Sequence, residues 1–369
     1  MRKSKELKEK LKSTIAELND LEKHFRLQKI YLRRNQAIDK DFKKVLGSNC
    51  VRITHDAKNP LVIGLGGPGM MTTQQKRMLG IAGCIGTMVE FADDDEKIKE
   101  ARRAFTVTLS SNTDKTSHAT LQNLFFALKK SPIKEILSNK KITQLEVTHD
   151  NAPNYISKEF LYGATKTITK MFPNLELLRW APLCPLHGKT HLDRRFSNLT
   201  TWQHDYQLNT RIGSIAHMKR VLESGCIGSN KKRREEGKHP ILTNFYRFRL
   251  QPPGAHANFV DIKNIKSMSC VTYIAKTSRR IQPSDTGFYI NVVPWIPWRK
   301  GKAVAKKLVH EGEEGKFIEP ESTVVRAEHK PAGHIKHRHL TCRSHHEKKC
   351  KLLRDLSINV KNVFNNVEF

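Results

Sequence analysis

The chain has 369 residues, of which 38% are hydrophobic and 28% are charged, a composition that supports a globular core. A chain of this length forms two or three domains, or one large domain with appendages. Lys and Arg outnumber Asp and Glu by 66 to 36, giving a formal net charge of +30. Such a surface repels itself unless its partner is a polyanion, and we expect nucleic acid. Neither a run of 18 apolar residues nor a basic amphipathic anchor occurs, so we expect no membrane partner.

Cysteine usage indicates a reducing compartment. The seven cysteines are odd in number and widely spread, and the sequence begins Met1-Arg2-Lys3 without the apolar region of a secretory signal. We therefore expect reduced thiols and an intracellular protein.

The N-terminal segment, residues 1–49, is predicted to be helical. Apolar residues recur at steps of three and four, with Lys and Glu between them, which predicts one long helix or two shorter ones over 5–45. We expect this helix to pack on the following domain, and a short oligomerising coiled coil is the alternative. The apolar residues of this pattern are Leu7, Leu11, Ile15, Leu18, Leu21 and Phe25.

From residue 50 the periodicity changes to that of strands, and later alternates between strands and helices. Three sequential strands followed by this alternation predict an α/β domain over 50–225, a mixed sheet with helices on its faces. The predicted strands are 50–56, 79–91, 105–110, 142–150 and 175–183, and the predicted helices are 117–130, 157–172 and 190–202.

The C-terminal part of the chain divides by composition. Residues 230–238 form a charge run that predicts an exposed loop. Residues 226–299 are aromatic and β-rich, which favours a small accessory β-region. Residues 300–369 form a basic tail rich in His and Cys, in which the spacing of Cys342, His345 and Cys350 is compatible with zinc. A disordered tail that touches DNA nonspecifically is the preferred interpretation.

Two segments of nearly identical sequence each end in an aspartate. Ile53-Thr54-His55-Asp56 and Val147-Thr148-His149-Asp150 are β-branched runs, and turn residues follow each Asp. Asp193 comes 43 residues after Asp150. Any one of these residues alone would be interpreted as a solvated or turn-capping Asp. Together, in this order of elements, they predict three carboxylates that meet around divalent cations, because dications relieve the repulsion between clustered carboxylates.

This layout resembles the RNase H-like fold of DDE/DDD transposases and retroviral integrases. The segment Asp150-Asn151-Ala152-Pro153-Asn154-Tyr155 is similar to the integrase-type Asp-Asn-x-Pro-x-Phe motif. The segment His187-Gly188-Lys189, followed by Leu192-Asp193, resembles the His-Gly-Lys…Asp box of eukaryotic transposase-derived proteins. The resemblance covers residues 50–205. Two departures are the 94 residues between the first two acids, wider than in integrases, and Asp in place of Glu as the third acid.

The resemblance implies a role for each acid in a site for two Mg²⁺ or Mn²⁺ ions. Asp56 would bridge both ions, Asp150 would hold one, and Asp193 would hold the other from its helix. Glu223 and Glu159 are the rival third acids. By strand alternation, His55 and His149 point away from the Asp that follows each, so we expect them to pack against a helix.

We therefore expect a DNA transposase-like enzyme that cleaves and joins strands, acts as a homo-oligomer on transposon ends and target DNA, and resides in the nucleus. The alternatives are a domesticated, catalytically inactive nucleic-acid-binding protein and a nuclease of the same fold, such as a junction resolvase. The run Lys231–Arg234 also fits a nuclear localisation signal. The predicted nucleic-acid contacts are His187, Lys189, Arg194, Arg195, Lys231, Lys232, Arg233 and Arg234.

Overall fold

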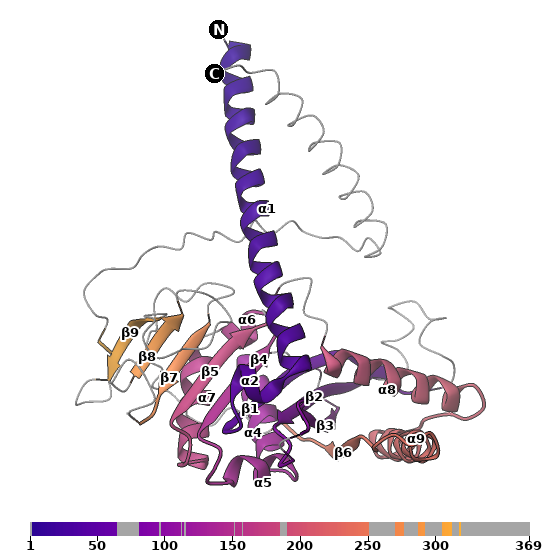
Figure 1. Cartoon of the computed structure of the whole chain (residues 1–369). Coiled ribbons are helices and arrows are strands. Elements are labelled where there is room, and N and C mark those ends of the chain that lie inside the picture. Colours follow the sequence, from indigo (N-terminus) through magenta and orange to yellow (C-terminus); the bar gives the residue numbers. More distant parts are fainter. Residues whose placement is uncertain are drawn as a thin grey trace. The chain divides into compact units, whose positions relative to one another are not determined.

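The computed structural model describes residues 2–64, 81–95, 97–111, 113, 116–150, 152–156, 158–184, 190–250, 270–276, 287–291, 305–311 and 317–318. The chain divides into two units. One comprises Met1–Asp20 and Val325–Phe369, and its described part is the beginning of helix α1 (Arg2–Lys40). The other, Leu21–Val324, contains the rest of α1 and all the remaining elements (Figure 1).

A mixed sheet of ten described strands forms the centre of this second unit, in the order β10-β9-β8-β7-β5-β4-β1-β2-β3-β6. Strands β1 (Cys50–Val62), β2 (Ile81–Phe91) and β3 (Arg102–Ser110) form an antiparallel meander. Strand β4 (Gln144–His149) lies parallel to β1, and β5 (Leu177–Pro182) lies parallel to β4. This topology confirms the predicted mixed sheet.

The later strands extend both edges of the same sheet. Strand β6 (Leu242–Arg247) pairs in parallel with β3, and β7 (Val271–Ile274) pairs antiparallel with β5. Strands β8 (Gly287–Asn291), β9 (Ala305–Glu311) and β10 (Phe317–Ile318) follow from β7. The region expected to be a separate β-subdomain therefore continues the main sheet.

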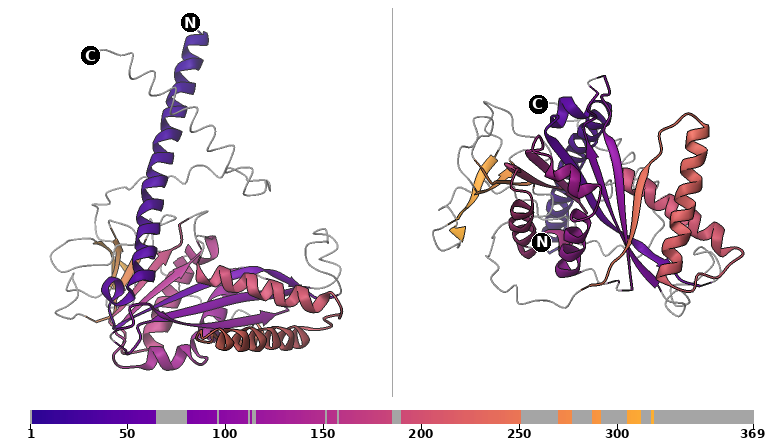
Figure 2. Two further views of the ribbon diagram at one scale, coloured as in Figure 1. Left: turned by 45° about the vertical axis from the view of Figure 1, so that its right-hand side comes forward. Right: turned by 90° about the horizontal axis from the view of Figure 1, so that it is seen from below.

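Four of the described helices cover one face of the sheet: α4 (Ser117–Leu128), α5 (Ile133–Ser138), α6 (Pro153–Ile156) and α7 (Lys158–Met171) (Figure 2). The odd-numbered residues of β1 and β4 point into this layer, because side chains alternate along a strand. Ile53 and Val147 are buried there with Leu124, Phe160 and Trp180. Helix α4 begins as predicted, with the side chain of Thr116 accepting a hydrogen bond from the backbone N–H of Ala119.

Helices α8 (His191–Gln207) and α9 (Ile215–Glu235) lie on the other face. The prediction of a loop over 230–238 was wrong for residues 230–235, which form the last turns of α9. The boundary expected between residues 225 and 226 also falls inside this helix. Helix α8 approaches β2 closely at Gly86, where an added Cβ would lie 2.7 Å from Leu192 Cδ1.

The predicted N-terminal helix is confirmed as α1, followed by the short α2 (Phe42–Leu46). From Leu27 onward α1 packs on the sheet, where Tyr31 joins a cluster with Leu183, and Ile38 joins one with Phe42. The prediction that the first strand ends at Asp56 was wrong. Strand β1 continues to Val62 because its pairing with β2 resumes after an irregularity between Lys58 and Leu61. Among the described helices, none is long and apolar enough to cross a membrane.

Candidate functional site

Asp56 lies on β1, and Asp150 directly follows β4, the parallel neighbour of β1. The residues before them, His55 and His149, are directly paired between β1 and β4. Asp56 and Asp150 are the next residues after this pair, so their backbones are close neighbours, because adjacent strands are only about 4.8 Å apart. Asp56 is half-buried and Asp150 is exposed. Oδ1 of Asp56 accepts a hydrogen bond from the backbone N–H of Ala57, at 2.7 Å.

Tyr155 lies close enough to both aspartates to be affected by their charges. This side chain of α6 is buried, and burial raises its pKa well above the usual value. The negative charges of Asp56 and Asp150 raise the pKa further. Both carboxylates therefore lie within electrostatic reach of the Tyr155 hydroxyl.

The two histidines lie on the opposite face, as expected. His149 stacks on Tyr155 with ring centroids 5.2 Å apart, and His55 contacts the same ring edge-on at 5.9 Å. Burial lowers the pKa of His55 to about 3 and that of His149 to about 4, so both are neutral at pH 7. His55 is also held through Nδ1, which lies 2.9 Å from Thr87 Oγ1. They are packing residues in this structure.

Asp193 is fixed at the start of α8 by a capping box. Its Oδ2 accepts hydrogen bonds from the backbone N–H of Thr190 at 2.7 Å and from the Thr190 hydroxyl at 3.0 Å. The Thr190 hydroxyl in turn accepts a bond from the backbone N–H of Asp193. No described residue hydrogen-bonds Oδ1 of Asp193, so one oxygen of this half-buried carboxylate remains available.

Helix α8 covers the face of the sheet to which Asp56 points. Gly86 is the register partner of Asp56 on β2, and directly paired residues of an antiparallel ladder point to the same face. The side chains of Leu192 and Phe196 lie over Gly86. The structure therefore brings the backbones of Asp56 and Asp150 close together and places Asp193 on the helix that covers the face of Asp56. The oxygens of the three do not form a group within 4.8 Å of one another in the described chain.

A polar cavity of about 440 Å³ lies between α1, the strands and α8. Thr54 and Thr148, two residues before the paired aspartates, form its floor, and their hydroxyl groups are 2.7 Å apart. The cavity is large enough for a small organic ligand. Its lining comprises Tyr31, Asn35, Asp39, Arg52, Thr54, Thr148, Leu183, Thr190, His191, Asp193, Arg194 and Ser197.

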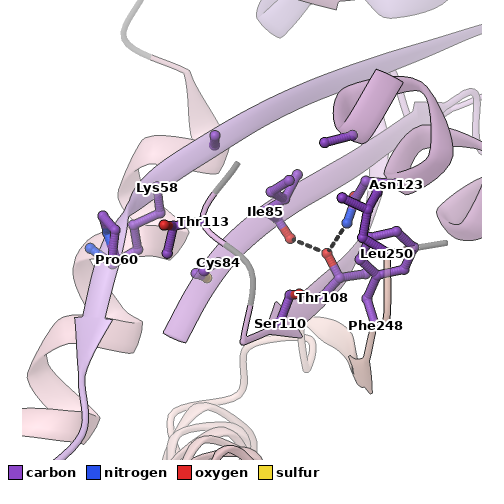
Figure 3. Close-up of a pocket in the computed structure, with 13 residues that line it drawn as sticks. Lys58, Pro60, Cys84, Ile85, Thr108, Ser110, Thr113, Asn123, Phe248 and Leu250 are labelled. Carbon is purple, nitrogen blue, oxygen red and sulfur yellow. Dashed lines mark hydrogen bonds between the residues drawn. The ribbon is translucent and has the colours of Figure 1, made fainter. Parts of the chain in front are cut away.

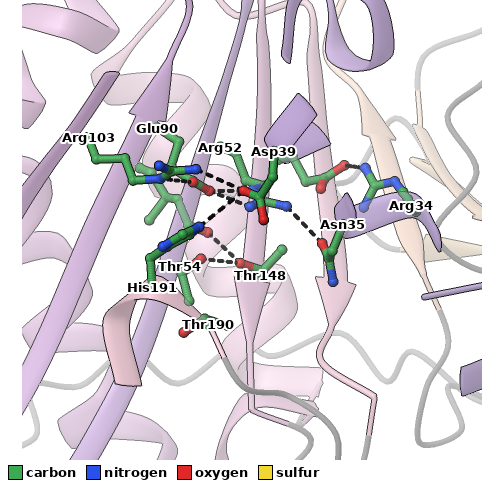
Figure 4. A network of polar contacts seen from close by, with 12 residues as sticks. Arg34, Asn35, Asp39, Arg52, Thr54, Glu90, Arg103, Thr148, Thr190 and His191 are labelled. Atoms are coloured by element: carbon green, nitrogen blue, oxygen red, sulfur yellow. Dashed lines mark hydrogen bonds and ion pairs between the residues drawn. The ribbon is translucent and has the colours of Figure 1, made fainter. Parts of the chain in front are cut away.

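One described group of three has ligand atoms within 4.8 Å of each other: Asp39, Glu90 and His191 (Figure 4). Guanidinium groups already neutralise its carboxylates. Glu90 is bonded to Arg52 at 2.5 Å and to Arg103 at 2.7 Å. Asp39 is bonded to Arg103 at 2.8 Å and to His191 at 3.1 Å, and these contacts lower its pKa. The group is an ion-pair network that joins α1, the sheet and α8, and two arginines disfavour a cation there.

The second cavity is small, about 30 Å³, and suits a water molecule rather than a substrate (Figure 3). It lies between the sheet and α4. Asn123 donates a hydrogen bond to Thr108 Oγ1 at 2.8 Å, and Thr108 donates to the carbonyl of Ile85 at 3.2 Å.

The predicted nucleic-acid contacts have different environments. Arg194 is exposed at the rim of the polar cavity. Arg195 is buried, contrary to the expectation of a phosphate contact. It donates hydrogen bonds to Cys226 Sγ at 3.0 Å and Thr243 Oγ1 at 2.5 Å, and it lies over Trp202. Within the run 231–234 at the end of α9, Arg233 bonds the carbonyl of His239, and the other three side chains are exposed. His187 and Lys189 lie outside the described residues.

Of the remaining expected sites, only the one at Glu223 lies within the described side chains. The rival third acid Glu223 is on α9, where it pairs with Lys219 at 2.6 Å. The backbone of Glu159 belongs to α7, but its side chain is outside the described residues. The zinc-compatible residues Cys342, His345 and Cys350 are outside them as well. Sequence reasoning missed the Thr190 capping box, although the spacing Thr-x-x-Asp before an apolar run is its usual signal.

Comparisons of this chain with protein-family models, with curated proteins and with solved structures found no match.

Proposed function

We propose that this protein is a metal-dependent polynucleotidyl transferase of the DNA transposase type, with an RNase H-like fold. The observation that supports the proposal is the pairing of His55 with His149 between parallel strands, after which Asp56 and Asp150 are the next residues. The strand order supports it, since a three-stranded meander precedes two parallel strands and the helix that bears Asp193. The sequence resemblance implies this same order of elements for the three acids.

The donor set suits hard divalent cations. Carboxylate oxygens are the protein ligands that Mg²⁺ and Mn²⁺ prefer. Asp56 and Asp150 would hold the ions between them, with Asp56 shared, and Asp193 would contribute its available Oδ1. Two bound ions would supply activation of the attacking oxygen and stabilisation of the leaving oxygen at phosphorus. The capping box keeps Asp193 oriented, and the neutral His55 and His149 pack on the other face of β1 and β4.

The charge of the chain supports nucleic acid as the substrate. The formal net charge is +30, and Lys231, Lys232 and Arg234 are exposed at the end of α9. Exposed cations of this kind bind phosphates and release counterions from DNA. Together with Arg194 beside the cavity, they would hold a DNA strand near the aspartates.

The proposal is tested with the full chain and a supercoiled plasmid in the presence of Mn²⁺. We expect metal-dependent nicking and joining that Asp56→Asn and Asp150→Asn each reduce by about 100-fold or more, because each removes a metal ligand. Asp193→Asn should do the same. Asp205→Asn, at an exposed position of α8, is the matched control and should keep full activity.

Retention of metal-dependent cleavage by Asp150→Asn would exclude the proposed site. Titration with Mn²⁺ alone gives a second measurement, since the wild-type chain should bind the ion and Asp150→Asn should bind it more weakly. A wild-type chain that binds DNA but neither binds Mn²⁺ nor cleaves would instead be an inactive nucleic-acid-binding protein.

A further inference from the structure

Helix α1 carries a row of exposed apolar side chains. Leu11, Leu18, Phe25 and Leu32 follow one another at intervals of seven residues and are 61%, 37%, 47% and 40% exposed. Ile15 lies beside the row and is 49% exposed. Single exposed apolar side chains are common on proteins, but a regular row of four side chains spaced seven residues apart is the pattern by which helices pair.

The row is not the surface by which α1 packs on its own sheet. That surface includes Tyr31, Arg34 and Ile38, which are buried. At about 100° per residue, Phe25 and Leu32 lie roughly 140° around the helix axis from those three residues. The row therefore stays exposed while α1 is docked.

Together with the positions three residues after each of its members, the row forms a heptad pattern (the seam) by which two copies of α1 can pair. If Leu11, Leu18, Phe25 and Leu32 take the first core position, a, of each heptad, the second core position, d, is occupied by Thr14, Leu21 and Gln28. A two-fold dimer requires such self-complementarity, because both copies use the same surface. The charges agree, since residues 5–32 contain seven Lys and Arg against five Asp and Glu, close to balance in a chain of net charge +30. A helical segment with nearly balanced charge suits a protein partner better than a polyanion.

We propose that α1 pairs with α1 of a second copy of this chain in an antiparallel coiled coil centred near Ala16. In this register Leu11 lies opposite Leu21 of the second copy, Leu18 opposite Thr14 and Phe25 opposite Leu7, whereas Leu32 lies beyond the paired segment. Ile15, which flanks the seam, meets Ile15 of the second copy. This dimer is independent of the proposed catalytic function.

The flanking charges select the antiparallel arrangement. In a parallel dimer the flanking positions g and e place Glu17 of each copy against Glu22 of the other, which gives two repulsive contacts. The antiparallel dimer replaces these two contacts by one between the two Glu17 residues. It also covers Ile15, which would remain exposed in the parallel dimer.

Light scattering coupled to size-exclusion chromatography tests the dimer on the full chain. We expect the wild-type protein to have about twice the monomer mass of 42.4 kDa. Leu18→Glu should weaken dimerisation at least tenfold, because it puts a charge into the seam, while helix content by circular dichroism stays unchanged. Ser13→Glu adds the same charge at an exposed position outside the seam and should remain dimeric. A monomeric wild type at tens of micromolar, or a dimer that Leu18→Glu leaves intact, would overturn the proposal.

Oxidative cross-linking tests the orientation. Ile15→Cys should form a disulfide-linked dimer under mild oxidation, because the two copies of this position meet across the antiparallel axis. Leu18→Cys should not, because it faces Thr14 of the second copy. The opposite result, cross-linking of Leu18→Cys alone, would establish a parallel dimer and overturn the arrangement. The wild-type chain measures the background from native thiols.

Discussion

At the scale of single residues, Glu146 shows how α1 is attached to the sheet. This carboxylate lies fully buried in β4, where it contacts Arg34 of α1 and Arg179 of β5, the latter at 2.8 Å. Burial alone would raise its pKa, but the charges of Arg34 and Arg179 outweigh burial and lower the pKa to about 2. The carboxylate is therefore charged in the folded protein and neutralises two buried guanidinium groups.

Replacing this carboxylate should destabilise the protein. Glu146→Gln would leave Arg34 and Arg179 buried without a counter-charge, and we expect the free energy of unfolding to fall by about 3–5 kcal/mol. Urea denaturation at pH 7 measures the loss. Glu135→Gln, at an exposed position of α5, is the control and should change it by less than about 0.5 kcal/mol. Equal denaturation midpoints for both variants would contradict the assignment.

The same carboxylate gives the wild type a defined pH dependence. Its pKa is lower in the folded state, about 2, than the ordinary 4.5, so its contribution to stability is present above pH 4.5. That contribution is lost as the pH falls from 4.5 towards 2. The decline in stability over this window should be shallower for Glu146→Gln than for the wild type.

The sequence could indicate the aspartates but not this network. Asp56 and Asp150 each follow a β-branched run, a local pattern that can be recognised in the sequence before the fold is known. Arg34 and Glu146 are 112 residues apart, and their pairing depends on how α1 docks on the sheet. A polar residue in a strand is ordinarily assigned to the solvated face, so nothing local marks Glu146 as buried.

At the scale of elements, apolar periodicity predicted most of the central strands and helices, and failed where polar residues dominate. The end of α9 was predicted as a loop because residues 230–236 are nearly all charged or polar. The helix forms nevertheless, because Met218, Val221, Leu222 and Cys226 bury one face of its earlier turns and the charged turns continue from it. The continuity of β1 through residues 57–60 was missed for a similar reason, since pairing with β2 outweighs the turn residues Asn59 and Pro60.

Two glycines of α9 test how closely it packs against α8. A Cβ at Gly225 would lie 2.4 Å from Cγ of Trp202, whereas a Cβ at Gly228 would meet nothing within 4 Å. We expect Gly225→Ala to lower the free energy of unfolding by about 1–3 kcal/mol through overpacking. Gly228→Ala should raise it by about 0.5–1 kcal/mol, because Ala favours the helix more than Gly. Thermal or urea unfolding measures both, and a change of the same sign in the two variants would show that α8 and α9 do not approach as described.

At the scale of the whole molecule, the excess of positive charge is the property most directly linked to a polyanionic partner. Its distribution is uneven, since α1 is nearly balanced over residues 5–32 while the end of α9 presents adjacent exposed cations. DNA binding through particular Lys or Arg side chains has a measurable signature, because each phosphate contact releases counterions and contributes to the salt dependence of the association constant. Removing a charged side chain that only aids solubility leaves the salt dependence of the association constant unchanged.

The exposed last turn of α9 should therefore contact DNA phosphates, and this contribution should appear in the salt dependence of the association constant. For Lys231→Ala/Lys232→Ala we expect weaker binding to duplex DNA, and a plot of log association constant against log salt whose slope is shallower by up to about 2, or about 0.9 for each lost phosphate contact. Lys134→Ala/Lys140→Ala removes the same charge from exposed positions in and after α5, and should leave the slope unchanged if α5 lies away from the DNA. Fluorescence anisotropy over a range of KCl concentrations makes the comparison. Equal slopes for the two double variants would mean that the positive charge acts only as a diffuse field and that α9 makes no phosphate contact.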